Sequence, residues 1–158
     1  MVVDELHDLG LERMDDEEIR GFLSSQKVGV LAFPDRESPY LLPMSYGFDD
    51  DVTLYFTFLV GSTSRKKELI EQAEYVSFLV YRVDSMFSWE SVLLQGTLKE
   101  IPETEWDTLD AETTSAWRPE ILRQAQSSGE VVLYGFQIAA QSGIRHTGLP
   151  PGFERQSE

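Results

Sequence analysis

The sequence contains no cysteine and only two histidines in 158 residues. Without cysteine, the chain can form no disulfide, offers no thiol nucleophile and cannot hold a metal or iron–sulfur centre through thiolates. The two histidines, His7 and His146, lie far apart in the sequence, and no potential ligands are spaced around them as in a zinc site. The sequence therefore predicts neither a disulfide-stabilised protein nor a metal centre.

Positive charge is also scarce. The chain has 13 lysine and arginine residues against 28 aspartate and glutamate residues, which gives a formal net charge of −15. Because such a chain repels phosphate backbones and anionic lipid head groups, we expect neither nucleic acid nor a membrane as a partner. The acid surplus and the low lysine content favour a halophilic protein, adapted to a salt-rich cytoplasm that screens self-repulsion; an ordinary acidic protein is the alternative.

Long apolar runs are absent as well. None approaches the roughly 20 residues that a membrane-spanning helix needs. The segment Met1–Glu5 has neither the basic region nor the apolar core of a signal peptide, so we expect a soluble, cytoplasmic protein. The 158 residues, 41% of them hydrophobic, suffice for one compact domain with its own core but not for two.

Short apolar runs bounded by turn residues predict a mainly β fold. The six expected strands are Lys27–Phe33, Tyr40–Phe48, Val52–Phe58, Tyr75–Val83, Ser88–Ile101 and Val131–Ala139. Pro43 interrupts the second run, which predicts a bulge, a strand end or an unpaired edge position there. Because consecutive strands are joined mainly by short turns, the pattern favours an antiparallel barrel with peripheral helices.

Helices are expected around this series of strands. Asp15 and Glu18 form a capping-box pattern ahead of an amphipathic segment that ends near Gln26. A second helix, Ser64–Glu74, follows the third strand. The other expectations are an arm or short helix over Met1–Met14, a helical insertion over 102–128, a single domain over 1–140 and a C-terminal tail over 141–158.

The segment Gly61–Lys67 is the one place in the sequence where three cations, Arg65, Lys66 and Lys67, are adjacent. They fall in the first turn of the second helix, where the macrodipole disfavours each cation by roughly 0.3–1 kcal/mol. A helix start also offers free backbone N–H groups, so a bound anion explains the cluster. The alternative is a solvated patch paired with nearby glutamates.

Helical spacing places Lys66 on the same face as the apolar Leu69 and Ile70, with Arg65 and Lys67 on either side. Lys66 is therefore expected to lean toward the body of the protein. This favours a phosphate-binding site at the start of the helix.

Several short motifs follow one another in a characteristic order. They are Leu42-Pro43-Met44-Ser45-Tyr46, Tyr55-Phe56-Thr57, Ser64-Arg65-Lys66, Val76-Ser77-Phe78 and Trp89-Glu90-Ser91-Val92 with Gly96. In this order the chain resembles the FMN-binding split barrel of the pyridoxamine 5′-phosphate oxidase superfamily, from about Leu23 to Ile101, with Val131–Ala139 completing the barrel. The resemblance implies a six-stranded antiparallel split β-barrel.

The resemblance also implies FMN as the cofactor and a homodimer, since members of the superfamily usually bind flavin between two subunits. The phosphate would be held by Ser64, Arg65 and Lys66, in agreement with the anion site inferred above. The flavin ring and ribityl chain would face Met44, Ser45, Tyr46, Phe56 and Thr57, and the flavin would be bordered from the fifth strand by Trp89 and Ser91. Core packing, or packing in the subunit interface for Trp89, is the alternative for these strand residues.

Two departures from the superfamily's pattern bear on the substrate. The stretch between Thr57 and Ser64 is longer than in the oxidase itself, and the tail lacks the oxidase's substrate-binding ending, which argues against oxidation of pyridoxamine phosphate. His146 beside Arg145 resembles a substrate-phosphate pair. We interpret His146 as solvated or cap-forming, with a place in the pocket as the alternative.

The sequence therefore predicts an FMN-dependent oxidoreductase acting on a small molecule, with its catalytic residue unidentified. A non-catalytic flavin carrier or redox-responsive module is the alternative, because no residue pattern demands general acid–base chemistry. A haem or a deazaflavin in the same fold is a further alternative, with His7 and His146 as the only imidazoles for haem ligation.

Overall fold

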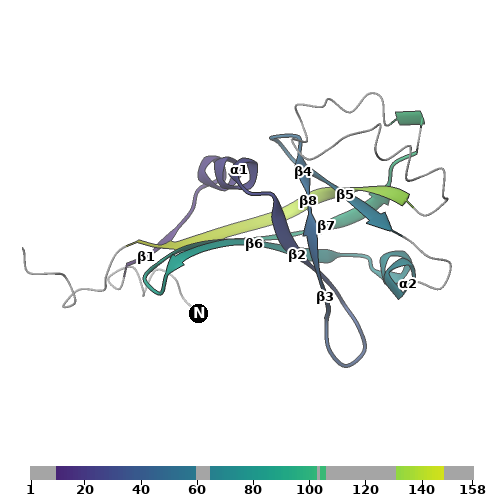
Figure 1. The fold of residues 1–158 in the computed structure, drawn as a ribbon, viewed down its shortest axis with the longest axis horizontal. Coiled ribbons are helices and arrows are strands. Elements are labelled where there is room, and N and C mark those ends of the chain that lie inside the picture. The colour runs from purple at the N-terminus through teal and green to yellow at the C-terminus, as the bar shows by residue number, and fades with distance from the viewer. Residues whose placement is uncertain (1–9, 60–64, 103, 106–130, 148–158) are drawn as a thin grey trace, which may run out of the picture.

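The computed structural model describes residues 10–59, 65–102, 104–105 and 131–147, and for Leu59, Arg65–Lys67 and Val131 only the backbone (Figure 1). The described chain is mainly β, as predicted. Its helices are α1 (Asp16–Ser25) and α2 (Arg65–Gln72). Its strands are β1 (Leu11–Arg13), β2 (Val28–Phe33), β3 (Tyr40–Ser45), β4 (Gly47–Phe48), β5 (Thr53–Leu59), β6 (Val76–Ser85), β7 (Ser88–Glu100) and β8 (Val131–His146).

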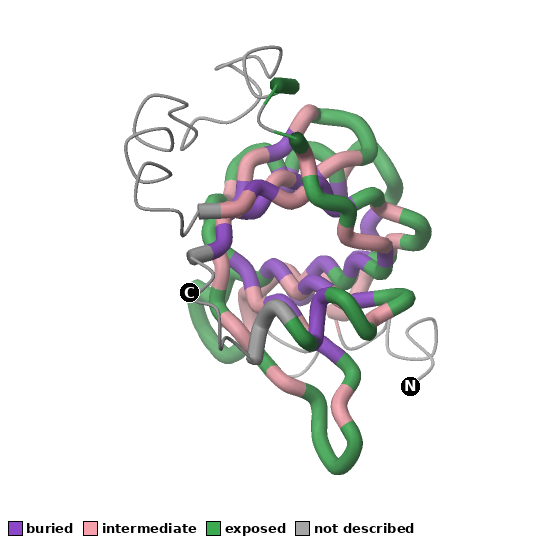
Figure 2. Tube along the Cα trace, turned by 90° about the vertical axis from the view of Figure 1, so that its right-hand side faces the viewer, coloured by how far each residue is buried: buried purple, intermediate pink, exposed green. Residues whose placement is uncertain are grey.

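The strands form one antiparallel sheet in the order β3-β2-β6-β7-β8-β5-β4, and β1 pairs with the C-terminal part of β8. The two outermost strands of this order, β3 and β4, are consecutive in the chain and separated only by Tyr46. The chain itself therefore joins the two ends of the sheet, and Figure 2 shows the trace curling into a ring that carries buried residues. The structure confirms an antiparallel split β-barrel.

The strand count differs from the six expected. The predicted strand Tyr40–Phe48 is divided at Tyr46 into β3 and β4, which belong to opposite ends of the sheet. The division has a physical cause, because the Tyr46 side chain turns into the core and its hydroxyl donates a hydrogen bond to the Leu23 carbonyl at 2.7 Å. The short strand β1 lies in the segment expected to be an arm or a helix, and that expectation was wrong for its three residues.

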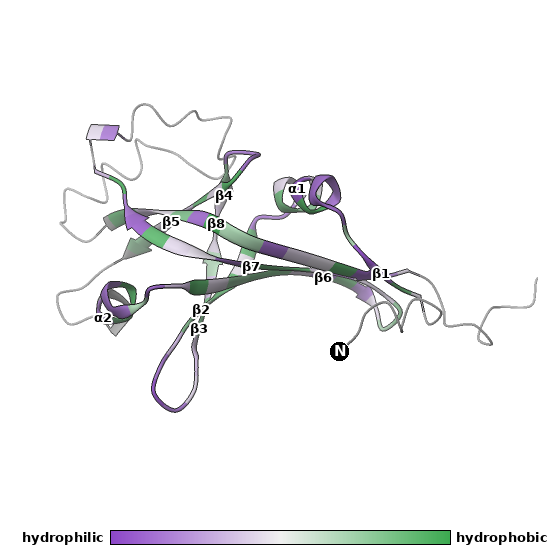
Figure 3. Cartoon of the chain, turned by 180° about the vertical axis from the view of Figure 1, so that it is seen from behind, coloured by the Kyte–Doolittle hydropathy of each residue, from purple (hydrophilic) through white to green (hydrophobic). Residues whose placement is uncertain are grey.

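The core is built around aromatic side chains that alternate along the strands. Phe56 is fully buried, and its ring centroid lies 4.9 Å from that of Phe78 and 6.0 Å from that of Phe136. Burying one such side chain contributes about 1.5–3 kcal/mol. Hydrophobic stretches run along the strands, whereas the outward turns of both helices and the loop between β2 and β3 are hydrophilic (Figure 3).

Helix α1 begins where the sequence predicted. Glu18 N donates to Asp15 Oδ1 at 2.8 Å and Asp15 N donates to Glu18 Oε1 at 3.4 Å, which confirms the capping box. The helix ends with Gln26 as C-cap and buries its apolar face against the barrel, through Ile19, Phe22 and Leu23. Because caps and amphipathic spacing are local features, the sequence alone was enough to predict this element.

Helix α2 follows β5 after residues 60–64, and it occupies most of the predicted range Ser64–Glu74. Leu69 and Ile70 are buried in the core, and Ala73 packs against it. The predicted apolar face is therefore confirmed.

Two strand irregularities have clear causes. Pro43 lies on β3 opposite Val30, and β3 is an outermost strand of the described sheet, which is the edge position among the three predicted alternatives. At Gly96 the pairing of β7 with β8 shifts register. A Cβ on Gly96 would collide with the Gln137 carbonyl, so only glycine allows this close approach.

Strand β8 extends to His146 rather than ending near Ala139. Gln141–His146 is therefore strand, and the expectation of a tail beginning at Gln141 was wrong at this point. The cause is pairing, because β7 offers β8 a partner from Trp89 to Glu100 and β1 adds a second partner beside the last three residues of β8.

No helix among the described residues is long and apolar enough to span a bilayer. The predicted helical insertion 102–128 lies, apart from Pro102 and residues 104–105, outside the described residues.

Candidate functional site

The residues predicted to contact a flavin fall into two groups in the structure. The first group comprises residues of β3, β5 and α2 and of the joint between β3 and β4: Met44, Ser45, Tyr46, Phe56, Thr57, Arg65 and Lys66. The second group, Trp89 and Ser91, lies on β7 near the hairpin that joins β6 to β7. Ser64 lies outside the described residues.

In the first group, two aromatic side chains belong to the core. Tyr46 and Phe56 are 4% and 0% exposed, and both rings pack edge-on against Phe78. Burial raises the pKa of the Tyr46 phenol well above its ordinary value. Both side chains turn inward and pack in the core, which was the alternative to ligand contact, so only their backbone remains for a ligand.

The other strand residues of this group are more accessible. Ser45 is exposed, and Met44 is half-buried with part of its side chain against the core. Thr57 is half-buried and lies opposite Leu133 on β8. These three residues keep side-chain atoms available for a ligand.

The start of α2 carries the two cations of this group. Arg65 and Lys66 occupy its first turn, where backbone N–H groups have no partner within the helix. Because Leu69 and Ile70 are buried, the helix phase places Lys66 on the same face, three and four residues earlier. The side chains of Arg65–Lys67 lie outside the described atoms, so their contacts remain predictions.

The second group lies far from α2 within one chain. Val76, which follows α2, pairs with Gly96, whereas Ser91 lies five residues before Gly96 on β7 and pairs with Tyr81. At the rise of an extended strand, this separation is about 17 Å. Figure 1 shows α2 and the β6–β7 hairpin at opposite ends of the sheet.

His146 is buried at the end of the sheet that carries the second group. It is 8% exposed, its Nδ1 lies 2.7 Å from the Phe87 carbonyl oxygen, and its ring stacks on Trp89 with centroids 6.1 Å apart. The interpretation of His146 as solvated was therefore wrong. The reason is that β8 continues far enough to set His146 directly opposite Trp89.

Arg145 points into a cluster of acids. Its Nε lies 3.4 Å from Glu12 Oε2, and it also forms an ion pair with Glu18. The guanidinium thus ties β1, β8 and the first turn of α1 together. In the sequence, Arg145 and His146 resemble a pair that binds a substrate phosphate. The structure gives no support for this role, because both side chains already have protein partners.

One face of the sheet, which we call the outer face, is turned away from the core and is largely apolar. Strand alternation places on it Val28, Tyr81, Val83 and Leu93, whose exposed fractions are 54%, 53%, 62% and 42%. Exposed apolar surface of this extent commonly marks a contact with another molecule. A hollow of about 570 Å³ at the junction of α1 and β2 opens on this face and is lined in part by Lys27, Val28, Pro43 and Tyr81.

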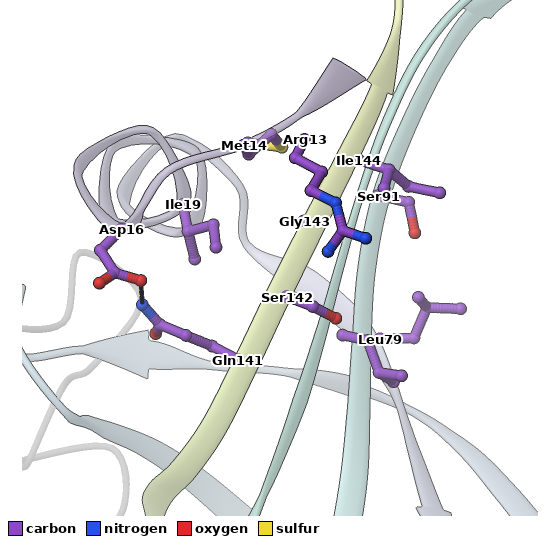
Figure 4. A pocket seen from close by; sticks show the side chains of 11 residues that line it. Arg13, Met14, Asp16, Ile19, Leu79, Ser91, Gln141, Ser142, Gly143 and Ile144 are labelled. Carbon is purple, nitrogen blue, oxygen red and sulfur yellow. Dashed lines mark hydrogen bonds between the residues drawn. The ribbon is translucent and has the colours of Figure 1, made fainter. Parts of the chain in front are cut away.

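A second hollow, of about 470 Å³, lies between β1, α1 and the outer face; we call it the Arg13 cavity (Figure 4). Its polar lining includes Arg13, Ser91, Gln141 and Ser142. The sequence prediction included only Ser91 of these residues. Arg13 was missed because the segment around it was taken as an arm or helix, and Gln141 and Ser142 because they were assigned to a tail. The alternation Leu11-Glu12-Arg13 was the one available signal for a strand there.

Fold and strand order define an antiparallel split barrel with two peripheral helices in the described chain. The chain belongs to the family described as pyridoxamine 5′-phosphate oxidase, whose sequence model matches residues 15–145. The resemblance drawn from the sequence is thereby confirmed. A search of the curated proteins finds none that matches this chain.

Solved structures of flavin proteins share the fold. A FAD-binding protein of Mesorhizobium loti is 23% identical with a TM-score of 0.68, and the match covers 87% of this chain and 98% of that one. The FAD-binding protein of Mycobacterium smegmatis is 12% identical with a TM-score of 0.58, covering 87% and 99%. A FAD and heme binding protein of the same organism is 16% identical with a TM-score of 0.65, covering 89% and 75%. At these identities the similarity establishes the fold.

Proposed function

We propose that the protein binds a flavin nucleotide, FMN, and acts as a flavin-dependent oxidoreductase on a small molecule. The observation that carries this proposal is the start of α2, where Arg65 and Lys66 enter the first turn of a helix on the fold of a pyridoxamine 5′-phosphate oxidase family member. Free N–H groups, the helix dipole and two cations together suit a phosphate. FMN ends in such a phosphate.

The remaining predicted contacts suit the rest of the cofactor. Ser45, Met44 and Thr57 offer accessible side chains, and the strands around Tyr46 and Phe56 offer backbone groups. The bound flavin supplies the redox chemistry, whereas these residues bind and orient it. A non-catalytic carrier or redox-responsive module would need the same residues, and turnover of a small molecule by the photoreduced protein would exclude it.

A second copy of the chain completes the proposed site. Within one chain, Ser91 lies about 17 Å along β7 from Gly96, which pairs with Val76 just after α2. The outer face, which carries Ser91, also carries the exposed Tyr81, Val83 and Leu93. We therefore propose a homodimer in which this face of one subunit borders the flavin held at α2 of the other.

FAD is a second candidate, because the similar solved structures include proteins described as FAD-binding. Haem is disfavoured, because His146 has one ring nitrogen at the Phe87 carbonyl and the other beside Gly10. Histidine ligation of a haem would then depend on His7, which lies outside the described residues. A deazaflavin has the same phosphate requirement and is distinguished by its absorption.

The test identifies the bound cofactor and then measures its affinity for the wild-type protein and two variants. Purified, desalted protein should show flavin absorption, and chromatography of the heat-released cofactor should show FMN rather than FAD or a deazaflavin. Lys66→Glu should weaken FMN binding at least about tenfold more than Lys67→Glu, because a charged hydrogen bond to phosphate contributes about 1.5–3 kcal/mol and only Lys66 shares the buried face. Equal losses would refute the assigned helix phase, and no flavin binding by titration would refute the function.

A further inference from the structure

The hollow of about 570 Å³ on the outer face, which we call the Lys27 hollow, lies where α1 joins β2. It is lined by the end of α1, the first residues of β2, Pro43 on β3 and Tyr81 on β6. Its volume lies within the range of small-molecule sites, about 300–1,000 Å³. The hollow is therefore large enough to hold a small ligand.

Strand register places the Lys27 hollow between two residues predicted to contact the flavin. On the outer face, Val28 pairs with Ser45, and Tyr81 pairs with Ser91. Continuing the register of β2 with β6 by two residues brings Val28 opposite Tyr81. One row across four strands therefore carries Ser45, Val28, Tyr81 and Ser91, and its ends lie about 14 Å apart. Both middle residues of this row line the hollow.

Two polar side chains of the hollow are open to a ligand. Lys27 and Tyr81 are exposed, and neither the ammonium nor the phenolic hydroxyl has a hydrogen bond or an ion pair within the part of the chain that the structure describes. Ser25, by contrast, donates through Oγ to the Phe22 carbonyl at 2.7 Å and accepts from Gln26 Nε2 at 3.2 Å. The ammonium and the phenol therefore remain for a ligand.

The backbone beneath these groups is held in place. The Lys27 carbonyl accepts a hydrogen bond from Tyr46 N at 3.0 Å. Two residues further on, Gly29 lies so close to the Phe78 ring that a Cβ would come within 2.5 Å of it. A site whose backbone is already fixed loses less conformational freedom when a ligand binds.

The lining combines one positive charge with apolar walls. No aspartate or glutamate is among the described residues that line the hollow, although the chain has 28 of them. Val28, Val30 and Pro43 supply apolar surface, and Tyr81 supplies an aromatic ring. A few convergent polar groups within apolar walls are typical of small-ligand pockets. Because one cation balances one negative charge, this lining suits a monoanion such as a carboxylate.

We propose that the Lys27 hollow binds a small organic carboxylate. The carboxylate lies on the Lys27 ammonium and the Tyr81 hydroxyl, and its apolar body lies against Val28, Val30 and Pro43. The assignment of this anion as the substrate rests on the proposed flavin function and homodimer, because Ser91, which pairs with Tyr81, would border the flavin of the other subunit. The substrate class is thus an apolar or aromatic acid.

The test compares two probes of nearly equal shape, 4-fluorobenzoate and the neutral 4-fluorobenzamide, by fluorine NMR titration of the full chain. In about 0.15 M salt, where distant charges are screened, wild-type protein should bind the carboxylate at least about threefold more tightly than the amide. Lys27→Met should abolish this preference, and Lys27→Arg should retain it, because arginine keeps the charge. Lys99→Met is the matched control, since Lys99 is an exposed lysine on β7 outside the hollow and the net charge changes equally.

The phenolic hydroxyl is tested separately. Tyr81→Phe keeps the ring and removes the donor, so it should reduce the preference for the carboxylate by about half. Tyr75→Phe, at an exposed tyrosine outside the hollow, should leave the preference unchanged. A preference that is the same in both tyrosine variants would overturn the placement of the carboxylate on Tyr81.

Equal binding of both probes by wild type would overturn the proposal. So would a preference that survives Lys27→Met, or that falls equally in Lys99→Met, in proteins with the wild-type circular dichroism spectrum. Repeating the titration with saturating FMN tests the substrate assignment: unchanged carboxylate binding supports it, and competition by FMN would refute it. Flavin binding without a carboxylate preference would refute the Lys27 hollow alone, and a carboxylate preference without flavin binding would refute the flavin function alone.

Discussion

Tyr46 is the residue through which the chain passes from one end of the sheet to the other. Its hydroxyl donates to the Leu23 carbonyl at 2.7 Å, and its ring packs edge-on against Phe78 with centroids 5.4 Å apart. The hydrogen bond fastens the joint between β3 and β4 to the last buried turn of α1. Burial disfavours the charged phenolate, which raises the pKa of Tyr46 above its ordinary value.

Replacing Tyr46 with phenylalanine should destabilise the protein by about 0.5–1.5 kcal/mol at neutral pH, since the Leu23 carbonyl loses its donor. The variant should also lose part of the pH dependence of stability. Because the folded pKa is raised, the contribution of the wild-type phenol is fully present below about pH 10 and is lost as the unfolded tyrosine ionises above it. The free energy of unfolding, measured with urea at neutral pH and again above about pH 10, should therefore fall less in Tyr46→Phe than in the wild-type protein.

Tyr75→Phe is the control for this pair of measurements, because Tyr75 is 55% exposed. It should leave stability nearly unchanged at neutral pH. A constant difference between wild type and Tyr46→Phe across the pH range would show that the buried phenol is not the group responsible.

Among the elements, the pairing of β7 with β8 organises the molecule. It runs from Trp89 opposite His146 to Glu100 opposite Tyr134, with one shift of register at Gly96. A bulge bends the strand that carries the extra residue, and such bends let a sheet curl into a barrel. The absence of a side chain at Gly96 is therefore a requirement of the curvature.

Gly96→Ala should destabilise the protein by about 1–3 kcal/mol, because the added methyl group would collide with the Gln137 carbonyl and the backbone would have to shift. Gly21→Ala is a control of opposite sign. Gly21 lies within α1 and a Cβ there would meet nothing within 4 Å, so alanine should stabilise the helix by about 0.5–1 kcal/mol. Thermal unfolding of both variants checks the pair, and a neutral Gly96→Ala would contradict the register.

At the scale of the whole molecule, the outer face bears on self-association and the net charge bears on the response to salt. The proposed homodimer buries the outer face, so a charge placed there should oppose association. Tyr81→Asp, at a position 53% exposed on this face, should give a monomer at concentrations where wild type is a dimer, because an unpaired charge is costly to bury. Sedimentation velocity measures the two states.

Val52→Asp is the matched control, since Val52 is 39% exposed but lies before β5, away from the outer face. It should leave the mass in solution unchanged. A wild-type protein that sediments as a monomer, or a Tyr81→Asp protein that remains a dimer, would refute the proposed interface.

We propose that the protein is adapted to high salt, because its formal net charge is −15. Raising potassium chloride from about 0.1 M to about 1 M shortens the Debye length from about 10 Å to about 3 Å and screens self-repulsion. Stability should rise by at least about 1 kcal/mol, or about 2–4 °C in Tm for a chain of this size. Sucrose, which stabilises by exclusion without screening charge, is the control, and a Tm that is flat or falling with salt would contradict the proposal.

Much of the fold followed from local features of the sequence. Asp15 and Glu18 set the start of α1, and the spacing of Leu69 and Ile70 set the buried face of α2, because capping and amphipathic periodicity depend only on near neighbours in the chain. The site was less accessible to such reasoning, since the inward turn of Tyr46 and Phe56 removed two predicted ligand-facing side chains.

The sequence by itself determined the family, the mainly β class and the cationic start of α2, since each depends on residues close together in the chain. Only the tertiary structure decided that Tyr46 closes the barrel, that His146 stacks on Trp89 and that Arg13 reaches toward Ser91. Those contacts depend on the register between strands distant in sequence. A shift of one residue would turn each of these side chains to the other face of the sheet.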